Sequence, residues 1–311
     1  MAEVLRLHRD IPETWKEILK LFIFWKQVEG RAPRTLKDYA DHVTRFFHRY
    51  PDSYPDHLRE AVLSYMAQEG IKPTTYNLRR EYLRGFFSWC CREGYLQKDP
   101  TAGLPKRKDE GRIVNIPPEI LTRLLSLPDV STFAGLRDRA LLFLCFDTGI
   151  RPGEALALRP SDVNLPALEV YVKAESAKTR TRRTLPISPP TAKALHEVIS
   201  ARHPGWALSV PLFPTFSGRP MSSSGWGHVL EKYVKKLGVK ITPYSLRHAF
   251  ALNFLRNGGN VFSLQRMMGH SDLTMTKKYL ALTQEDIRAE HQRASPVLAL
   301  IPERHRVRKI K

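Results

Sequence analysis

Thr148-Gly149-Ile150-Arg151-Pro152-Gly153-Glu154 is the first of three short segments that decide how this sequence is interpreted. The second is Tyr244-Ser245-Leu246-Arg247-His248. The third is Met268-Gly269-His270-Ser271-Asp272, with Tyr279 nine positions after His270. Arg151 stands at a predicted helix start, where backbone N–H groups favour an anion, and Arg247 supplies a second guanidinium fork for the same phosphate. The segments therefore predict a site that stabilises the charge of a phosphate with side chains alone.

The composition is that of a folded, strongly basic protein. The chain has 311 residues, 42% of them hydrophobic and 26% charged, which suits two globular domains. Its formal net charge is +19, and residues 111–311 contribute +15 of it, so we expect a polyanionic partner. The apolar runs are too short to span a bilayer, and the first thirty residues resemble neither a secretory signal nor a transit peptide. We therefore expect a cytoplasmic, nucleoid-associated protein with no membrane partner.

The sequence contains none of the short motifs that hold a nucleotide or a catalytic metal. It has no Walker loop, no GxGxxG, no HExxH and no carboxylate cluster. Cys90, Cys91 and Cys145 form no CxxC pair, so reduced thiols are expected. We therefore expect neither a cofactor nor a metal site.

Hydrophobic periodicity predicts a mainly α protein with a small β-sheet. Apolar residues at helical spacing predict four helices, over residues 13–29, 33–50, 57–68 and 73–93, in a domain that spans residues 1–103. Residues 104–113 are basic and interrupted by proline and glycine, which is typical of a linker. Residues 114–292 form a second, mainly helical domain, in which alternation over 168–187 predicts a hairpin with a charged turn. Residues 293–311 form a basic tail with an apolar stretch at 297–301.

The three segments, in this order and behind a four-helix domain, resemble the tyrosine recombinase (phage integrase) family over residues 12–292. The resemblance implies an N-terminal SAM-like core-binding domain and an α+β catalytic domain that together form a C-shaped clamp around DNA. It implies a Xer-like, two-domain, site-specific recombinase that cuts duplex DNA through a 3′-phosphotyrosyl intermediate and a Holliday junction, without metal or ATP.

The resemblance also assigns roles to individual residues. Tyr279 is the expected nucleophile, and Arg151 and Arg247 are the expected phosphate ligands. His270 is expected to hydrogen-bond a non-bridging oxygen, and Glu154 to orient Arg151 from the same helix face. Lys178, in the charged turn, is expected to protonate the leaving oxygen, with Lys173 as the alternative.

One position departs from the family pattern. Tyr244 stands three residues before Arg247, where the family usually has a histidine, and a neutral phenol is a poor base near pH 7. Either the surrounding cations activate the nucleophile, or His248 compensates for the missing base. Of these, we favour the cations, with His248 supporting the fold.

The remaining expectations concern DNA and partners. The candidate DNA-binding residues are Arg79, Arg80 and Arg84 on the fourth helix and Lys106 and Arg107 in the linker, although each could also be a solvated surface residue. The family implies a homotetramer on two DNA sites, an accessory DNA-bending or directionality protein, and a C-terminal tail that packs in trans. A type IB topoisomerase and a DNA-binding protein with an impaired active site remain alternatives.

Overall fold

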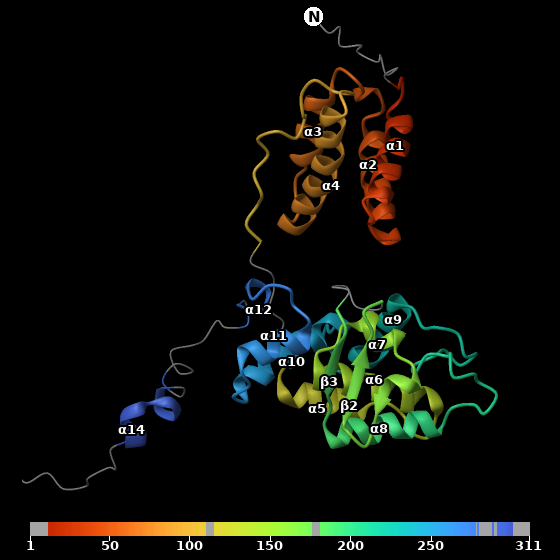
Figure 1. The fold of residues 1–311 in the computed structure, drawn as a ribbon, viewed down its shortest axis with the longest axis vertical. Helices are drawn as coiled ribbons and strands as arrows, with labels where there is room; N and C mark the ends of the chain where they lie inside the picture. The colour runs from red at the N-terminus through yellow and green to blue at the C-terminus, as the bar shows by residue number, and fades with distance from the viewer. Residues whose placement is uncertain are drawn as a thin grey trace, which may run out of the picture. The chain divides into compact units, whose positions relative to one another are not determined.

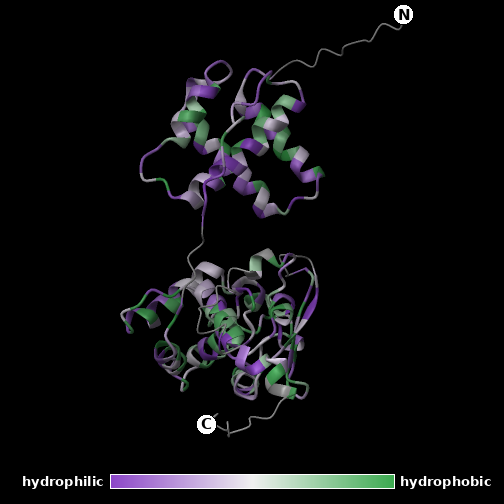
Figure 2. Cartoon of the chain, turned by 90° about the vertical axis from the view of Figure 1, so that its left-hand side faces the viewer, coloured by the Kyte–Doolittle hydropathy of each residue, from purple (hydrophilic) through white to green (hydrophobic). Residues whose placement is uncertain are grey.

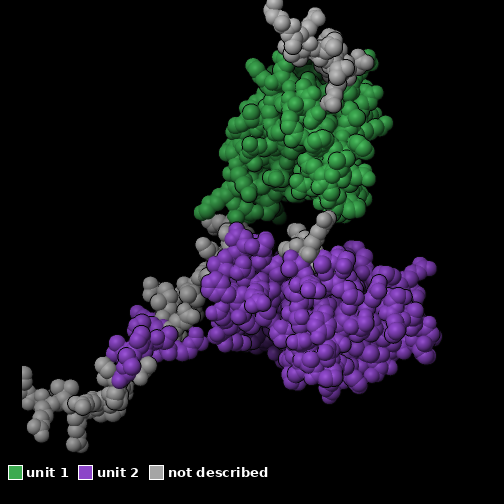
Figure 3. Space-filling view, viewed as in Figure 1, with its two compact units in different colours: residues 1–111 green, residues 112–311 purple. Residues whose placement is uncertain are grey.

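The computed structural model describes residues 12–109, 115–175, 181–277, 279, 288 and 291–300. The chain divides into two compact units, residues 1–111 and 112–311, which Figure 3 distinguishes by colour. Most of the described residues lie in helices, and one small sheet occurs in the second unit (Figure 1). Each unit has its own hydrophobic core.

Four helices form the first unit, as the periodicity predicts. Thr14 caps the first helix through a capping box with Glu17, and prolines at the first turn start the second and fourth helices. Six fully buried aromatic side chains dominate the core between these helices, namely Phe22, Phe46, Phe47, Tyr65, Phe86 and Phe87. The helices are α1 (Trp15–Val28), α2 (Pro33–Arg49), α3 (Leu58–Met66) and α4 (Pro73–Arg92), with a 3₁₀ turn η1 (Pro51–Ser53) after α2.

The second unit surrounds one buried helix, α6 (Phe133–Thr148), which packs against α8 and α10. In both units the ribbon alternates between polar and apolar colours along the helices (Figure 2), as expected where one face meets a core. The other helices are α5 (Pro118–Ser126), α7 (Pro152–Ala157), α8 (Pro189–Ser200), α9 (Ser223–Lys235), α10 (Pro243–Arg256), α11 (Val261–Met268), α12 (Thr274–Lys277) and α14 (Pro296–Leu300), with a 3₁₀ turn η2 (Pro160–Asp162). Within the described ranges, none of the helices is both long and apolar enough to cross a bilayer.

The sheet contains the predicted hairpin and one strand that the periodicity missed. Strand β2 (Glu169–Val172) pairs antiparallel with β3 (Arg183–Pro186), and Val170 lies opposite Leu185. Both side chains are fully buried, so this face of the hairpin packs against the hydrophobic core of the second unit. The additional strand β1 (Val163–Asn164) pairs with β2 and has two residues, which is too short to show an alternating pattern.

Candidate active site

Two glycines end helices at the site in the left-handed conformation that favours glycine. Gly149 (φ 62°) ends α6, and Gly269 (φ 59°) ends α11. A Cβ on Gly149 would approach the ring of Phe250 to 2.2 Å, and a Cβ on Gly269 would lie 3.2 Å from the guanidinium of Arg183. Arg151 stands two residues after Gly149, and His270 directly follows Gly269. The two turns therefore place Arg151 and His270 at the same site.

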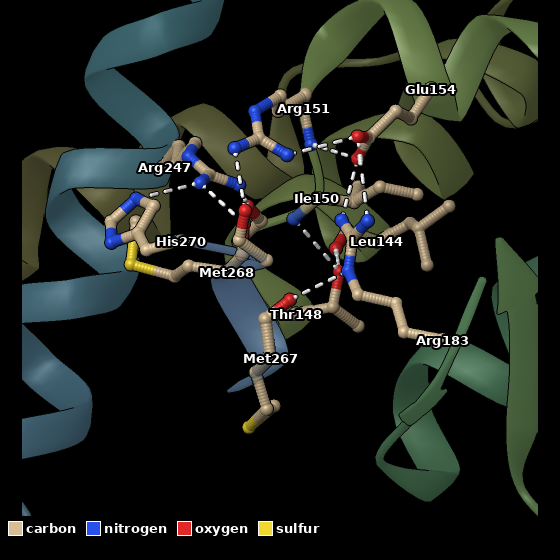
Figure 4. A network of polar contacts seen from close by, with 12 residues as sticks. Leu144, Thr148, Ile150, Arg151, Glu154, Arg183, Arg247, Met267, Met268 and His270 are labelled. Carbon is tan, nitrogen blue, oxygen red and sulfur yellow. Dashed lines mark hydrogen bonds and ion pairs between the residues drawn. The ribbon is translucent and has the colours of Figure 1, made fainter. Parts of the chain in front are cut away.

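Three arginines bind three consecutive carbonyl groups at the end of α11 (Figure 4). Arg183 Nε donates to Met267 O at 3.0 Å. Arg247 Nη2 donates to Met268 O at 2.7 Å, and Arg151 Nη2 donates to Gly269 O at 2.9 Å. The last carbonyls of a helix lack intrahelical partners and carry partial negative charge. The end of α11 therefore fixes three cations around one point.

Glu154 lies beside two of these arginines. Its carboxylate accepts from Arg151 Nη1 at 3.0 Å and from Arg183 Nη2 at 2.5 Å, and 2% of its side chain is exposed. Burial alone would raise the pKa of Glu154, but the hydrogen bond and charge of Arg183, together with those of Arg151, hold the pKa below its ordinary value. Glu154 is therefore ionised at neutral pH, and it binds both Arg151 and Arg183.

Arg247 is the most enclosed of the cations, with 1% of the residue exposed. Besides Met268 O, its guanidinium donates to Gly149 O, so it joins the ends of α6 and α11. Burial and then the nearby charge of Arg151 lower the pKa of Arg247, but an arginine starts so far above neutrality that it remains a cation. Arg247 therefore supplies a positive charge in a place that water hardly reaches.

His270 lies between Arg247 and Thr276. Its Nε2 is 3.0 Å from Arg247 Nη2, and its Nδ1 is 2.9 Å from Thr276 Oγ1. Because a guanidinium can only donate, Nε2 is the acceptor here, and the proton of the neutral ring is on Nδ1. To donate to a phosphate oxygen, as expected, His270 Nε2 must therefore leave the Arg247 contact and gain a proton, either by protonation of the ring or by a change of tautomer.

Tyr279 is buried, with 5% of the residue exposed, and belongs to a small apolar cluster with Phe250, Leu264 and Met268. Burial raises the pKa of Tyr279 to about 12, although the charge of Arg247 acts in the opposite direction. Its hydroxyl lies 2.6 Å from Nδ1 of His248. The phenol is therefore neutral at physiological pH and lies in hydrogen-bond contact with a group that can accept its proton.

This contact gives His248 a position that the sequence interpretation did not favour. His248 is one residue after Arg247 on α10 and reaches the nucleophile candidate directly, so support of the fold does not account for it fully. Tyr244, one turn earlier, is 47% exposed, and its ring lies 5.3 Å from the ring of His248 in an edge-on arrangement. Tyr244, which the sequence predicts at the active site, therefore lies beside His248.

The lysine expected to act as the acid lies outside the described residues, because Lys178 falls within residues 176–180. Its alternative, Lys173, forms an ion pair with Asp162, with Nζ 2.7 Å from Oδ1. Among the residues that the structure describes, no group of three or more histidine, cysteine, aspartate or glutamate side chains is placed to hold a metal ion.

The candidate DNA-binding residues of the first unit divide into two groups. Arg84 and Lys106 are exposed, and Arg107 is exposed as well but belongs to the second group by its contacts. Arg79 donates to Tyr65 O and Gln68 Oε1, Arg80 donates to Leu104 O, and Arg107 lies over the ring of Tyr76 at 3.9 Å. The members of this second group stabilise their own unit, and the first linker residues lie along α4.

Arg183 is the residue that the sequence analysis missed. It opens β3 and is 10% exposed at the side chain, but its contacts are with α7 and α11. The sequence gives only a weak signal for this position, because Arg183 ends a basic run that is typical of a solvent-exposed turn. Only the fold shows that this arginine contacts the site, whereas Arg182 beside it is exposed.

Comparison with known proteins identifies the class. The model described as "Phage integrase family" matches residues 115–286. The chain is 29% identical over 278 residues to "Tyrosine recombinase XerD" of Staphylococcus aureus (strain N315), an alignment that covers 86% of this chain and 92% of that protein. The structure of the Tn1549 transposon integrase in complex with transposon right end DNA matches with a TM-score of 0.70 at 22% identity, over 89% of this chain and 98% of that one. A lambda integrase tetramer bound to a Holliday junction matches with a TM-score of 0.67 at 19% identity, over 86% and 81% of the two chains.

The mainly helical fold and the family match over residues 115–286 thus define the class, the tyrosine recombinases. This chain belongs to the phage integrase family, as the sequence resemblance predicts. The predicted fold class, mainly helical with a small sheet, is confirmed.

Proposed function

We propose that this chain is a site-specific recombinase that cuts and rejoins duplex DNA through a covalent bond between Tyr279 and a DNA 3′-phosphate. One observation carries the proposal. The phenol of Tyr279 contacts His248, and the preceding residue on α10, Arg247, contacts His270, so a nucleophile, a proton acceptor and a cation cluster meet at one site. This combination matches the needs of phosphoryl transfer, in which charge grows on the non-bridging oxygens.

The cleavage step begins with attack of Tyr279 Oη on the scissile phosphorus. The phenolic proton passes to His248, the bond from phosphorus to the 5′-oxygen breaks, and Lys178 supplies the proton that turns the leaving group into a free 5′-hydroxyl. Attack by a 5′-hydroxyl reverses these events and restores the phenol. One phosphodiester is exchanged for another, so the bond energy is conserved and the reaction needs neither a nucleotide nor a metal ion.

Arg151, Arg247 and His270 stabilise the phosphate during this exchange. Arg151 has 11% of its side chain exposed and begins α7, so it is the cation more accessible to an incoming oxygen. Arg247 is almost fully enclosed, and its charge acts at short range in a site with little water. Glu154 is the positioning residue for Arg151.

Double-stranded DNA is the proposed partner, since related integrases are described in complex with DNA. We assign DNA binding to residues 1–103 and catalysis to residues 114–292. Arg84 within the first of these ranges and Lys106 just beyond it are exposed cations. Recombination then proceeds in a homotetramer on two sites through a Holliday junction, with an accessory protein that bends DNA or sets direction. The exposed apolar side chains of Val297 and Leu300 on α14 suit a tail that packs on a neighbouring protomer.

The test is covalent capture of DNA. Nicked duplexes that cover the DNA flanking the coding sequence lose a short 5′-hydroxyl fragment on cleavage, which traps the intermediate. We expect a protein–DNA adduct that survives denaturation, and peptide mapping should locate the attached DNA at Tyr279. The Tyr279→Phe variant should bind the same DNA and give no adduct. An adduct in Tyr279→Phe would refute the assignment. Relaxation of any supercoiled plasmid by a monomer, without junctions, would instead indicate a topoisomerase.

A further inference from the structure

We propose that Arg183 is a positioning residue for the cleavage reaction, which holds both Arg151 and His270 in place without touching DNA itself. The proposal rests on the proposed function, because it concerns the same site. It assigns to strand β3 a role that its position in a basic hairpin does not suggest.

Arg183 joins two elements that each carry a reacting group. Its Nη2 and Nη1 donate to the carboxylate of Glu154, at 2.5 and 3.4 Å, and this carboxylate also binds Arg151. Its Nε donates at 3.0 Å to Met267 O, three residues before His270. One side chain therefore connects α7 and the end of α11 to the sheet (Figure 4).

The contacts of Arg183 suit positioning better than phosphate binding. All three of its nitrogen atoms donate to groups of the protein, and 10% of the side chain is exposed. Gly269 lies close against the guanidinium, because a Cβ there would come within 3.2 Å of it. The turn before His270 therefore packs closely against the Arg183 guanidinium.

Charge balance gives Arg183 a second effect on Arg151. Glu154 carries one negative charge and lies between two guanidinium groups, so neither cation is fully neutralised. Without Arg183, the carboxylate would pair with Arg151 alone and compete with DNA for its donors. The shared arrangement keeps Arg151 oriented while it leaves a net positive charge for the phosphate.

The experiment compares Arg183→Met and Arg183→Lys with Arg139→Met. Arg139 pairs with Glu197 at 3.5 Å in the same unit, between α6 and α8, so its variant removes an arginine–glutamate pair outside the site. The measurements are the dissociation constant for DNA, the single-turnover rate of adduct formation, and the thermal unfolding temperature. We expect Arg183→Met to lose about 10²-fold in rate, because a small misplacement of reacting groups costs that much, with DNA affinity unchanged within about threefold. Arg183→Lys can reach Glu154 but not Met267 O as well, so it should recover part of the rate.

A double-mutant cycle separates positioning from direct contact. If Arg183 acts through the shared carboxylate, part of its effect is already lost in a Glu154→Gln background, and the rate changes are not additive. Full additivity, or a rate for Arg183→Met equal to that of Arg139→Met, would overturn the proposal. A loss of DNA affinity equal to the loss of rate would overturn it as well, because it would identify a phosphate contact.

A spectroscopic measurement keeps this result distinct from the proposed function. If the wild type gave no Tyr279 adduct, the proposed function would fail, but the NMR signals of the His270 ring would still report its position. We expect these signals to shift in Arg183→Met and to stay unchanged in Arg139→Met. Unchanged signals in both variants would overturn the positioning role whether or not the wild type cleaves DNA.

Discussion

The contact between His248 and Tyr279 predicts a specific change in the pH dependence of cleavage. The proposed perturbation is His248→Gln, which keeps a polar side chain of similar length but cannot accept a proton near neutral pH. In the structure, Nδ1 of His248 lies 2.6 Å from the phenol oxygen, and in the tautomer that carries its proton on Nε2 this nitrogen accepts the hydrogen bond from Tyr279. The substitution therefore removes the proton acceptor and leaves the arginine cluster intact.

The pKa of Tyr279 sets the size of the effect. Burial raises this pKa to about 12, so at pH 7.5 the phenol is ionised in about three molecules per 100,000. A variant without a base must react through that fraction, so its rate should rise about tenfold for each pH unit between 7 and 9. The wild type needs an unprotonated imidazole, so its rate should rise with pH only until His248 is deprotonated and should then level off. At pH 7.5 we expect His248→Gln to be slower by about 10²–10⁴-fold, with a gap that closes as the pH increases.

The assay is single-turnover adduct formation on a nicked duplex, measured from pH 5 to 9 at constant ionic strength. His196→Gln, an exposed histidine on α8, is the matched control and should follow the wild-type profile. Thermal unfolding of each variant verifies that the fold is retained. If His248→Gln has the rate and the pH profile of the wild type, His248 is not the base, and the cations alone activate Tyr279.

Three further predictions follow from the site. Arg151→Ala should reduce the cleavage rate by about 10²–10³-fold, because it removes a transition-state donor, and equal losses in rate and in DNA affinity would show a simple binding contact. Cleavage should proceed in EDTA without nucleotide, because the proposed step exchanges one phosphodiester for another and the arginines supply the positive charge, and a strict magnesium requirement in the adduct assay would contradict this. The lowered pKa of Glu154 should stabilise the fold above its ordinary value of 4.5, with the contribution lost as the pH falls through the lower folded-state pKa. Thermal unfolding should therefore show a weaker loss of stability in acid for Glu154→Gln than for the wild type, and parallel curves would contradict the assignment.

Most of the helices could be predicted from the sequence because their signals are local. Apolar spacing, prolines at first turns and glycines at helix ends specify elements such as α4 and α6 without knowledge of the partners. Strand β1 could not be found in this way, because two residues form a strand only through their pairing with β2. Similarly, the basic run that ends at Arg183 indicates solvent exposure in sequence, whereas the position of this residue is set by pairing of β3 with β2.

The candidate site shows the same division between local and long-range information. The positions of Arg151 and Glu154 follow from one helix turn, and their contact was predictable from a spacing of three residues. The contact of His248 with Tyr279 joins residues 31 positions apart, and the sequence offered a role for His248 at the nucleophile only as the less favoured of two alternatives. Sequence motifs thus predicted most of the groups that the structure brings together, while the proposals for the base and for Arg183 depend on positions in space.

The cluster of cations raises a physical question, since three arginines within one buried site repel one another. A single carboxylate, Glu154, offsets one charge, and the structure offsets the others mainly with backbone dipoles. Met267 O, Met268 O and Gly269 O each accept from a different arginine, and Gly149 O accepts from Arg247 as well. Carbonyl groups stabilise the cations without neutralising them, so the site keeps a positive field that a second or third carboxylate would remove. The two left-handed glycines are therefore tied to the chemistry, because the turns they form aim these carbonyl groups at the arginines and leave the positive charge available to a phosphate.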